Sequence, residues 1–491
     1  MAAACVMVLG TSSGAGKSWI ATALCRYYAN QGLKVSPFKA QNMSNNARVV
    51  DVDGREGEIG SAQYFQALAA RVEPSVLMNP VLLKPEADTK SQVIIMGQVN
   101  HSLSQIAWRE RSEMLWPYIQ TSLDHLIATN EVVVIEGAGS PAEINLMTND
   151  IVNLRVARYA NARCLIVTDI DRGGAFAHLF GTWGLLDASD RKMISGFVLN
   201  KFRGDATLLS PGPEMLEELT GVPVVATIPM MRAHGLPEED GVFDDSKKFG
   251  SLIKNQVKII KIAIIAYPRM SNLDEFQPLK NCDQVDLIWA REAQDLLNVD
   301  WIILPGSKHT SSDLDWLRIH GLDRQVCAHA QSGGKVLGIC GGLQMLGQSL
   351  HDPFGIDGSR DGLALLPLNT IFAKDKTVKK TQLQFNEFNG PWNFFSGLSL
   401  IGYEIHHGET SQIDKPDFSG GLCELLPGIG WTNTEGNVMG IYIHGLFEEE
   451  QVITRAFGDS SQPLDSVFEK LSEHFEKNSA NGLMRKLINK D

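Results

Sequence analysis

A glycine-rich loop near the start of the chain contains the residue types that bind nucleotide phosphates. It reads GTSSGAGKS over residues 10–18 and lies between an apolar run and a stretch with helical periodicity. In such a loop, backbone N–H groups and a helix N-terminus hold phosphate oxygens, the lysine reaches the terminal phosphates and the serine hydroxyl binds Mg²⁺. The usual spacing would place a glycine where Thr11 stands. The predicted nucleotide-binding residues of the loop are Thr11, Gly14, Gly16, Lys17 and Ser18.

Polar residues at other expected strand ends could complete this site. Glu136 ends the run VVVIE and precedes Gly-Ala-Gly, where a carboxylate can hold Mg²⁺ directly or through water. Asp53 and Glu58 are weaker candidates for a second acid. Lys39 follows a short strand and could neutralise a transferring phosphoryl group. Asn200 ends another strand, at a place where folds of this kind often contact the base.

A cysteine in the second half of the chain lies in a context that suits a nucleophile. GICGG, residues 338–342, follows an apolar run and precedes the helical pattern LQMLGQSL. A sharp turn from strand to helix exposes the sulfur of Cys340, and the helix N-terminus favours its thiolate form. The remaining cysteines have no such context and are interpreted as structural: Cys5, Cys25, Cys164, Cys282, Cys327 and Cys423.

A thiolate nucleophile needs a base, and His444 in GIYIHGLF is the best candidate because it ends another apolar strand. His406 and His407 suit a substrate-lining or structural role better. The loop LPGS, residues 304–307, also ends a strand. Its Gly306 N–H, together with that of Gly341, is predicted to form an oxyanion hole.

The elements that must position these residues alternate between short β-branched runs and longer amphipathic stretches. Such alternation predicts an α/β fold with mostly parallel sheets covered on both faces. In the first half, the expected strands are Cys5–Leu9, Glu131–Ile135, Arg163–Thr168, Ser195–Leu199 and Pro223–Ile228. The expected helices include Ser18–Asn30 and a long one from about Ser102 to Thr129, broken near Pro117.

A polar stretch rich in glycine, proline and charge interrupts the alternation, and strands resume after it. We therefore predict two α/β domains, at residues 1–229 and 258–450, joined by a linker at 230–257. The second domain is expected to contain strands at Val257–Ala266, Trp301–Leu304, Lys335–Ile339 and Val438–Ile443. A helical tail, residues 451–491, is expected to pack on the second domain.

Composition excludes several classes of protein. The chain has 491 residues, 44 of them basic and 57 acidic, for a net charge of −13. Such a balance argues against binding to nucleic acid or to anionic membranes, although not against a local pocket for an anionic substrate. No apolar run reaches the roughly 18 residues that a membrane span requires. Scattered cysteines without CxxC pairs are typical of a reducing compartment, so we expect a cytoplasmic enzyme.

The motifs GICGGLQMLG, LPGSKHT and YIHGLF together resemble the class I glutamine amidotransferases. That resemblance implies hydrolysis of L-glutamine through a thioester at the cysteine, with release of ammonia. Most members of that family carry a glutamate two residues after the histidine, whereas this chain has Leu446 there. The absence is typical of the cobyrinate-amidating branch, and it leaves open which group orients His444.

The N-terminal half resembles the P-loop fold of the dethiobiotin synthetase type, whose loop has the same extra residue. This resemblance implies an ATP-dependent synthetase. In it, Lys17 and Lys39 would contact phosphates, Ser18, Glu58 and Glu136 would surround Mg²⁺, and Asn200 would meet the adenine.

Longer stretches resemble the cobyric acid synthase family, among them FKAQNMSNN (38–46), DGREGEIGSAQYFQALAA (53–70) and DIDRGGAFAHLFGT (169–182). The likeness runs from about residue 4 to residue 450. It implies amidation of the b, d, e and g carboxylates of adenosylcobyrinic acid a,c-diamide, a corrinoid. Ammonia made at Cys340 would pass to the N-terminal site and displace phosphate from an acyl phosphate.

Two other interpretations stay open. The sister enzyme, cobyrinic acid a,c-diamide synthase, shares both domains but usually carries an acidic GPDYID-type loop where this chain has QNMSNN (41–46). Amide side chains can bind a substrate that has many carboxamides and carboxylates without like-charge repulsion. This favours the later step, amidation of the b, d, e and g carboxylates. Gln41, Asn42 and Asn45 are therefore candidate substrate ligands. Alternatively, the leucine at position 446 would leave the second domain inactive and the chain a nucleotide-binding regulatory module.

Overall fold

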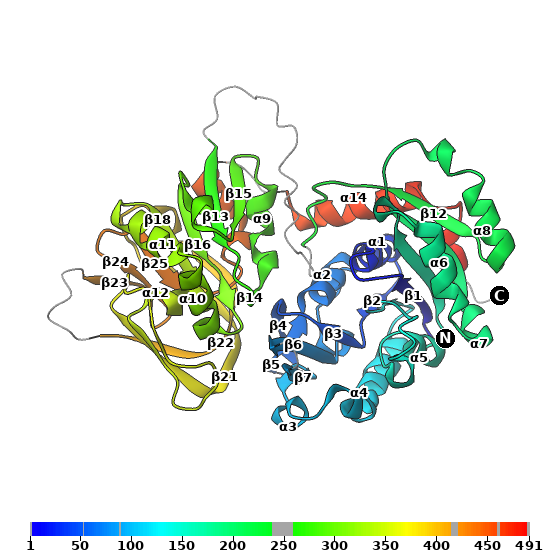
Figure 1. Ribbon diagram of the computed structural model, residues 1–491, viewed down its shortest axis with the longest axis horizontal. Coiled ribbons are helices and arrows are strands. Elements are labelled where there is room, and N and C mark those ends of the chain that lie inside the picture. Colours follow the sequence, from blue (N-terminus) through cyan, green and yellow to red (C-terminus); the bar gives the residue numbers. More distant parts are fainter. Residues whose placement is uncertain are drawn as a thin grey trace. The chain divides into compact units, whose positions relative to one another are not determined.

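The computed structural model describes residues 2–52, 54–87, 90–237, 259–413, 421–458 and 462–488 (Figure 1). The chain forms two compact units. The N-terminal unit comprises Met1–Ser44, Val50–Leu236 and Pro463–Asp491, and the C-terminal unit comprises Asn45–Val49 and Pro237–Gln462. Asp53 and most of the predicted linker lie outside the described residues.

A six-stranded sheet with the order β12-β11-β10-β1-β9-β2 organises the N-terminal unit. All of its paired strands are parallel, as the alternating pattern predicts. Its strands are β1 (Ala4–Gly10), β2 (Val35–Phe38), β9 (Val132–Glu136), β10 (Arg163–Asp169), β11 (Ile194–Phe202) and β12 (Val224–Pro229). The glycine-rich loop at residues 10–18 therefore follows the carboxyl end of β1, an inner strand of the sheet. Parallel α/β sheets bind their ligands at this end of the strands.

Helices cover both faces of this sheet. Side chains of β1 alternate between two hydrophobic cores, with Met7 and Leu9 in one and Val6 and Val8 in the other. The helices are α1 (Lys17–Asn30), α2 (Ser61–Ala69), α3 (His101–Ser104), α4 (Trp108–Thr129), α5 (Leu154–Tyr159), α6 (Ala175–Gly184), α7 (Ala188–Arg191), α8 (Gly212–Thr220), α14 (Leu464–Lys477) and α15 (Leu483–Ile488). Among the described helices, none is both long and apolar enough to cross a membrane.

Shorter elements complete the unit. The strands of a four-stranded sheet are β3 (Gln41–Met43), β6 (Val81–Ala87), β7 (Lys90–Ile95) and β8 (Gln98–Val99). Strand β4 (Ala47–Val52), whose first three residues are grouped with the C-terminal unit, pairs with β5 (Arg55–Gly60). Single 3₁₀ turns are η1 (Val76–Met78), η2 (Met147–Asn149), η3 (Ile170–Arg172) and η4 (Ala206–Leu209).

The helix expected to break at Pro117 does not break there. Helix α4 passes through Pro117, and the interruption lies earlier, between α3 and α4. Pro117 is exposed, so the carbonyl that loses its hydrogen bond can meet water, while Leu115, Trp116 and Ile119 beside it are buried. Burial of these neighbours outweighs the local cost of the proline.

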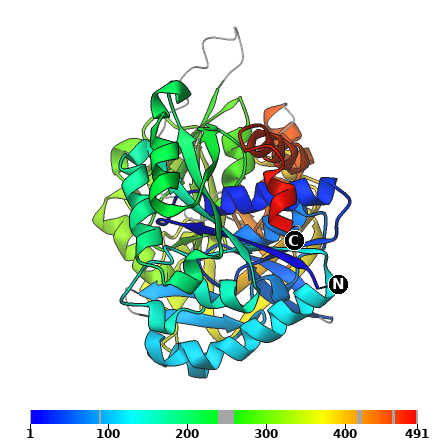
Figure 2. The same cartoon turned by 90° about the vertical axis from the view of Figure 1, so that its right-hand side faces the viewer.

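The expectation that the tail packs on the second domain is wrong for residues 463–491. Helix α14 packs against α1 in the N-terminal unit, and Figure 2 shows the red C-terminal helices beside blue α1. Buried Arg26 forms ion pairs with Asp465 (2.5 Å) and Glu469 (3.3 Å). The Tyr28 hydroxyl donates to the Met484 carbonyl at 2.9 Å. The amphipathic pattern of α14 predicts a covered face but does not specify the surface that covers it.

A seven-stranded sheet with the order β15-β13-β16-β18-β25-β24-β23 organises the C-terminal unit. The pairs from β15 to β25 are parallel, and those with β24 and β23 are antiparallel. The strands are β13 (Ile260–Ile265), β15 (Val285–Ala290), β16 (Trp301–Leu304), β18 (Lys335–Ile339), β23 (Leu422–Leu426), β24 (Gly430–Asn433) and β25 (Val438–Ile441). Both units are α/β, and the predicted fold class is confirmed.

The remaining elements of this unit surround that sheet. Its helices and 3₁₀ turns are α9 (Gln277–Asn281), α10 (Thr310–Ile319), α11 (Leu322–Gln331), α12 (Gly341–Leu346), α13 (Glu450–Phe457), η5 (Leu273–Phe276), η6 (Ala293–Leu296), η7 (Asn393–Phe395) and η8 (Leu446–Glu448). The additional strands are β14 (Met270–Ser271), β17 (Gly306–Ser307), β19 (Ser349–His351), β20 (Arg360–Asp361), β21 (Leu368–Gln384) and β22 (Ser399–Gln412).

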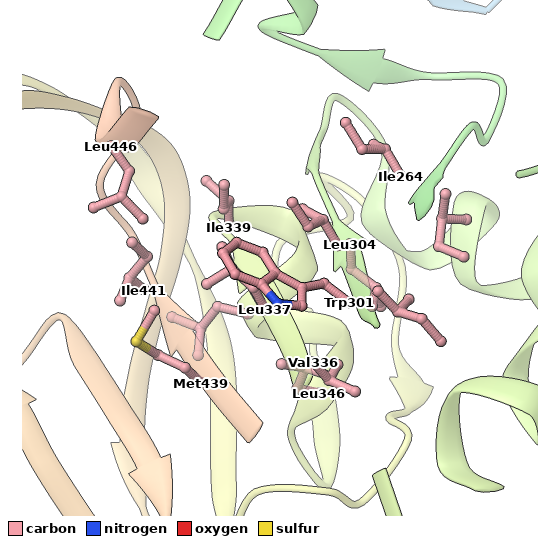
Figure 3. Packing of buried hydrophobic residues seen from close by; sticks show 14 of the residues in the cluster. Ile264, Trp301, Leu304, Val336, Leu337, Ile339, Leu346, Met439, Ile441 and Leu446 are labelled. Atoms are coloured by element: carbon pink, nitrogen blue, oxygen red, sulfur yellow. The ribbon is translucent and has the colours of Figure 1, made fainter. Parts of the chain in front are cut away.

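One large core lies beneath the C-terminal ends of these strands. Figure 3 shows Leu446 with Ile339 and Ile441 among its apolar side chains. Leu446 is fully buried. A charged residue at this position would be costly to bury among aliphatic neighbours. The group that orients His444 must therefore come from another part of the chain.

Candidate functional site

The glycine-rich loop holds its lysine folded back on the loop itself. Lys17 is buried, and its ammonium donates to the carbonyls of Ser12 (3.0 Å) and Gly139 (3.1 Å). Gly16 adopts φ 101°, and a Cβ on it would lie 2.0 Å from the side-chain nitrogen of Asn200. Only glycine fits here, because both the left-handed backbone and the close neighbour exclude a side chain.

Glu136 gathers polar groups from three separate segments at the carboxyl end of β9. Its carboxylate accepts hydrogen bonds from Ser18 Oγ (2.8 Å), Lys39 Nζ (2.9 Å) and Gln66 Nε2 (2.6 Å). Burial opposes its ionisation, but Lys39 and the hydrogen bonds outweigh burial and hold the pKa of the Glu136 carboxyl below its usual range. A buried, ionised carboxylate with a serine hydroxyl beside it is a pair of hard oxygen donors.

Thr11 and Asn200, two further predicted residues of this site, and Lys201 form hydrogen bonds at the glycine-rich loop. Thr11 Oγ1 donates to Thr168 Oγ1 at 3.0 Å, and Lys201 Nζ donates to the Gly14 carbonyl at 2.9 Å. Asn200 donates from Nδ2 to the Ala15 carbonyl at 2.9 Å, so its amide braces the loop. The base-contacting role of Asn200 stays a prediction.

The acid Glu58 has a different setting from Glu136. It is buried and forms an ion pair with Lys84 of β6. Glu58 would have to loosen this pair to bind a metal, so its metal role also stays a prediction. In the candidate substrate loop, Gln41 and Asn42 are largely buried, and Asn42 Nδ2 donates to Gln63 Oε1 at 3.3 Å. Within the described chain, the buried Oδ1 of Asn45 has no hydrogen-bond partner.

Cys340 has the backbone of a nucleophile elbow. It follows β18 and precedes α12, and its φ of 51° is unusual for a residue other than glycine. Gly342, two residues after Cys340, lets the turn pack closely against β16. A Cβ at this position would lie 1.9 Å from the Leu304 carbonyl oxygen. The sulfur is hydrogen-bonded with His444 and lies 3.5 Å from the Ile405 carbonyl.

His444 is held by a carboxylate that sequence reasoning did not identify. Glu275 Oε1 lies 2.9 Å from His444 Nδ1, and Glu275 Oε2 accepts from the Gly445 N–H at 3.0 Å. Both side chains are buried. Cys340, His444 and Glu275 therefore form a relay in which the carboxylate fixes the ring and leaves its other nitrogen toward the sulfur. Burial lowers the pKa of His444, but Glu275 and Cys340 together raise it to about 10.

The strand ends of β16, β18 and β25 bring the predicted oxyanion residues to the same place. A Cβ on Gly306 would lie 2.8 Å from His444 Cε1, and one on Gly341 would lie 2.8 Å from the Ser307 nitrogen. The tight approach requires glycine at both positions. The role of their N–H groups as oxyanion donors stays a prediction.

The competing histidines are engaged elsewhere. His406 lies 3.1 Å from Glu404 and 2.8 Å from the Gly408 carbonyl, and it stacks on the ring of Tyr442 at 3.9 Å. His407 lies 3.3 Å from the Ala373 carbonyl. These contacts agree with the preference for His444 as the base.

No local sequence signal marks Glu275. It stands in a 3₁₀ turn, 169 residues before His444, in the unremarkable stretch NLDEF. Gln66, a ligand of Glu136, is likewise a helix residue without a motif. A glutamate two residues after the histidine can be found by inspecting the sequence. A glutamate that is distant in the chain and adjacent only in the folded structure cannot.

Comparison with known proteins agrees with this geometry. Residues 6–240 match the family model of the CobQ/CobB/MinD/ParA nucleotide binding domain, and residues 261–452 match that of the CobB/CobQ-like glutamine amidotransferase domain. The cobyric acid synthase of Acidovorax ebreus (strain TPSY) is 61% identical over 97% of this chain and 98% of its own length. Those of Polaromonas sp. (strain JS666) and Variovorax paradoxus (strain S110) are each 59% identical, covering 98% and 99% of this chain and 98% and 100% of their own lengths. With a nucleotide-binding unit, an amidotransferase unit and identity along nearly its whole length, this chain belongs to the cobyric acid synthase family.

Proposed function

We propose that this chain uses ATP and glutamine to amidate the b, d, e and g carboxylates of adenosylcobyrinic acid a,c-diamide. The observation that carries the proposal is the near full-length identity to cobyric acid synthases, combined with both sites in one chain. The cytoplasm is the proposed location, on the strength of the scattered cysteines.

Glutamine hydrolysis belongs to the C-terminal unit. The Cys340 thiolate attacks the side-chain amide carbon, and the protonated His444 gives its proton to the departing nitrogen, so that ammonia leaves and a thioester remains. Water activated by His444 then releases glutamate. The N–H groups of Gly306 and Gly341 would stabilise the oxyanion in both steps. Glu275 keeps the imidazole in the orientation that both proton transfers need.

Amide synthesis belongs to the N-terminal unit, whose residues fit MgATP. The Lys17 ammonium donates to two backbone carbonyls of the loop region, contacts that phosphate oxygens can replace, and Ser18 and Glu136 offer hard oxygen donors. Bound Mg²⁺ would neutralise charge on the transferring phosphoryl group. Lys17 and Lys39 would orient the phosphates so that a substrate carboxylate takes the γ-phosphoryl group. Ammonia then displaces phosphate from the acyl phosphate.

Glu275→Gln tests the relay. The amide keeps the shape of the carboxylate but removes the charge that raises the pKa of His444. We expect kcat for glutamine hydrolysis to fall by about 10²-fold. The alkaline limb of the rate should move to lower pH, because the imidazolium loses its proton more easily without the neighbouring charge. Steady-state glutamate release between pH 6 and 10 measures both effects. An unchanged limb would remove Glu275 from the relay.

The function itself is tested with the corrinoid. The protein is incubated with MgATP, labelled glutamine and adenosylcobyrinic acid a,c-diamide, and the corrinoid is followed by mass spectrometry. Four successive amide additions are expected. Consumption of ATP and glutamine without change in this corrinoid would refute the substrate, and parallel incubation with cobyrinic acid would reveal the a,c-amidating activity instead. No turnover of any kind would refute the enzyme.

A further inference from the structure

Five residues of the N-terminal half belong to the amidotransferase unit. Asn45–Val49 are grouped with that unit by their contacts, although Ser44 and Val50 on either side belong to the N-terminal unit. The segment directly follows Gln41 and Asn42, the candidate substrate ligands, and includes Asn45. A stretch of chain thus leads without interruption from the proposed corrinoid loop into the glutaminase unit.

This segment binds the 3₁₀ turn η5 that carries Glu275. Asn46 Oδ1 accepts from the Leu273 N–H at 3.0 Å, and the Ala47 N–H donates to Asn272 Oδ1 at 3.1 Å. The Arg48 guanidinium forms an ion pair with Asp274, the residue immediately before Glu275. Three successive residues, two in the turn and the one before it, are therefore held by three successive residues of the segment.

Arg48 also contacts residues next to the histidine. Its guanidinium pairs with Glu448 at 2.6 Å and lies over the ring of Tyr403, 5.1 Å from the ring centre. The Tyr403 ring in turn stacks on His444 at 5.3 Å, and the His444 N–H donates to the Tyr403 carbonyl at 2.9 Å. Arg48 thus contacts both the residue before Glu275 and the ring that stacks on His444.

Charge makes Arg48 more than a packing residue. Arg48 and Asp274 are both buried, and burial together with the neighbouring carboxylates of Asp274 and Glu275 raises the pKa of Glu448 although Arg48 opposes the shift. Removal of the guanidinium would leave Asp274 buried and uncompensated beside Glu275. Relief of that repulsion requires the turn to shift or a carboxylate to take up a proton, and either change disturbs the group that orients His444.

We propose that Arg48 is the positioning residue through which occupancy of the corrinoid loop at residues 41–46 controls glutamine hydrolysis at Cys340. The inference rests on the proposed function, because it takes the corrinoid as the ligand of that loop. A ligand that contacts residues 41–46 shifts the equilibrium between arrangements of Arg48 only as far as it binds one of them better. Ammonia would then be made quickly only when an acceptor carboxylate is present.

The test measures glutamate release by the full-length protein with and without adenosylcobyrinic acid a,c-diamide, in the absence of ATP so that no corrinoid is consumed. We expect the corrinoid to raise kcat of the wild-type protein at least about fivefold, in line with typical coupling between sites. Arg48→Gln should lose this acceleration. Asp274→Asn should lose it too, since it breaks the same ion pair without altering residues 41–49.

Two further variants separate positioning from general damage. Arg48→Lys should restore part of the acceleration, because an ammonium can pair with one carboxylate but not fork between two. Arg360→Gln is the matched control, since Arg360 forms an exposed pair with Asp315 in the same unit and should behave as wild type. The inference is overturned if Arg48→Gln or Asp274→Asn keeps the full acceleration, or if the wild-type protein shows none.

Ammonia-dependent amidation in the same preparations distinguishes the two levels of the proposal. If the wild-type protein amidates the corrinoid with ammonium chloride and MgATP but shows no acceleration of glutaminase, the coupling fails and the proposed function stands. If it amidates nothing with either nitrogen donor, the proposed function fails. Ammonia-dependent synthesis by Arg48→Gln also shows whether that variant folds. If Arg48→Gln does not fold, the acceleration measured in Asp274→Asn decides whether the inference holds.

Discussion

Cys340→Ala abolishes glutamine-dependent amidation while ammonia still supports it. The alanine removes the sulfur that forms the thioester, so we expect glutamate release to fall by at least about 10⁵-fold. The synthetase site is on a different unit and should accept ammonia from solution. Because neutral ammonia is scarce at pH 7, ammonium salt at high pH is the condition for the rescue.

The matched control for this variant is Cys423→Ala, which removes an exposed thiol from the same unit. It should leave glutamine-dependent amidation at the wild-type rate. Mass spectrometry of the corrinoid and enzymatic assay of glutamate measure the two half-reactions separately. Loss of amidation with both nitrogen donors in Cys340→Ala would contradict a two-site enzyme.

Lys17→Ala removes amidation with glutamine and with ammonia alike. The ammonium of Lys17 lies against the backbone of the glycine-rich loop, and alanine leaves the transferring phosphoryl group without this positive charge. Loss of one such charged contact at a phosphoryl group costs about 10³-fold or more in rate. Corrinoid-dependent ADP formation should fall in parallel.

Basal glutamate release serves as the internal control for Lys17→Ala, since Cys340, His444 and Glu275 all belong to the other unit. Lys192→Ala, which removes an exposed lysine from the N-terminal unit, should amidate normally. Normal amidation by Lys17→Ala would refute its phosphate role. Loss of glutaminase as well would indicate a folding defect rather than a missing phosphate contact.

Local patterns in the sequence predict the strand ends that carry both sites. Apolar runs followed by glycine-rich turns indicate where the strands end, and parallel strands place such turns at one edge of a sheet. For this reason the loop at residues 10–18, Glu136, Cys340 and His444 can each be picked out from neighbours a few residues away. Each of these residues is marked by a short pattern of its neighbours in the chain.

Groups that act across long separations could not be found in this way. The destination of α14 was predicted wrongly, because its apolar stripe matches any complementary surface and only packing selects α1. The helix through Pro117 was predicted to break, because the burial of its neighbours is a tertiary effect. In both cases the local pattern is real, and the energy that decides the outcome comes from elsewhere in the molecule.

The sequence by itself determined the α/β class, through the alternation of its elements, and it predicted the nucleotide loop, the nucleophile elbow and the histidine proposed as the base, since each lies in a short motif with its own backbone chemistry. Tertiary structure alone decided which acid serves His444. Leu446 is buried in an apolar core, and the fold instead brings Glu275 from 169 residues away. It likewise decided that Arg48 pairs with Asp274, the residue before that acid. A buried carboxylate is stable only where the fold supplies its donors, and no motif encodes such a meeting.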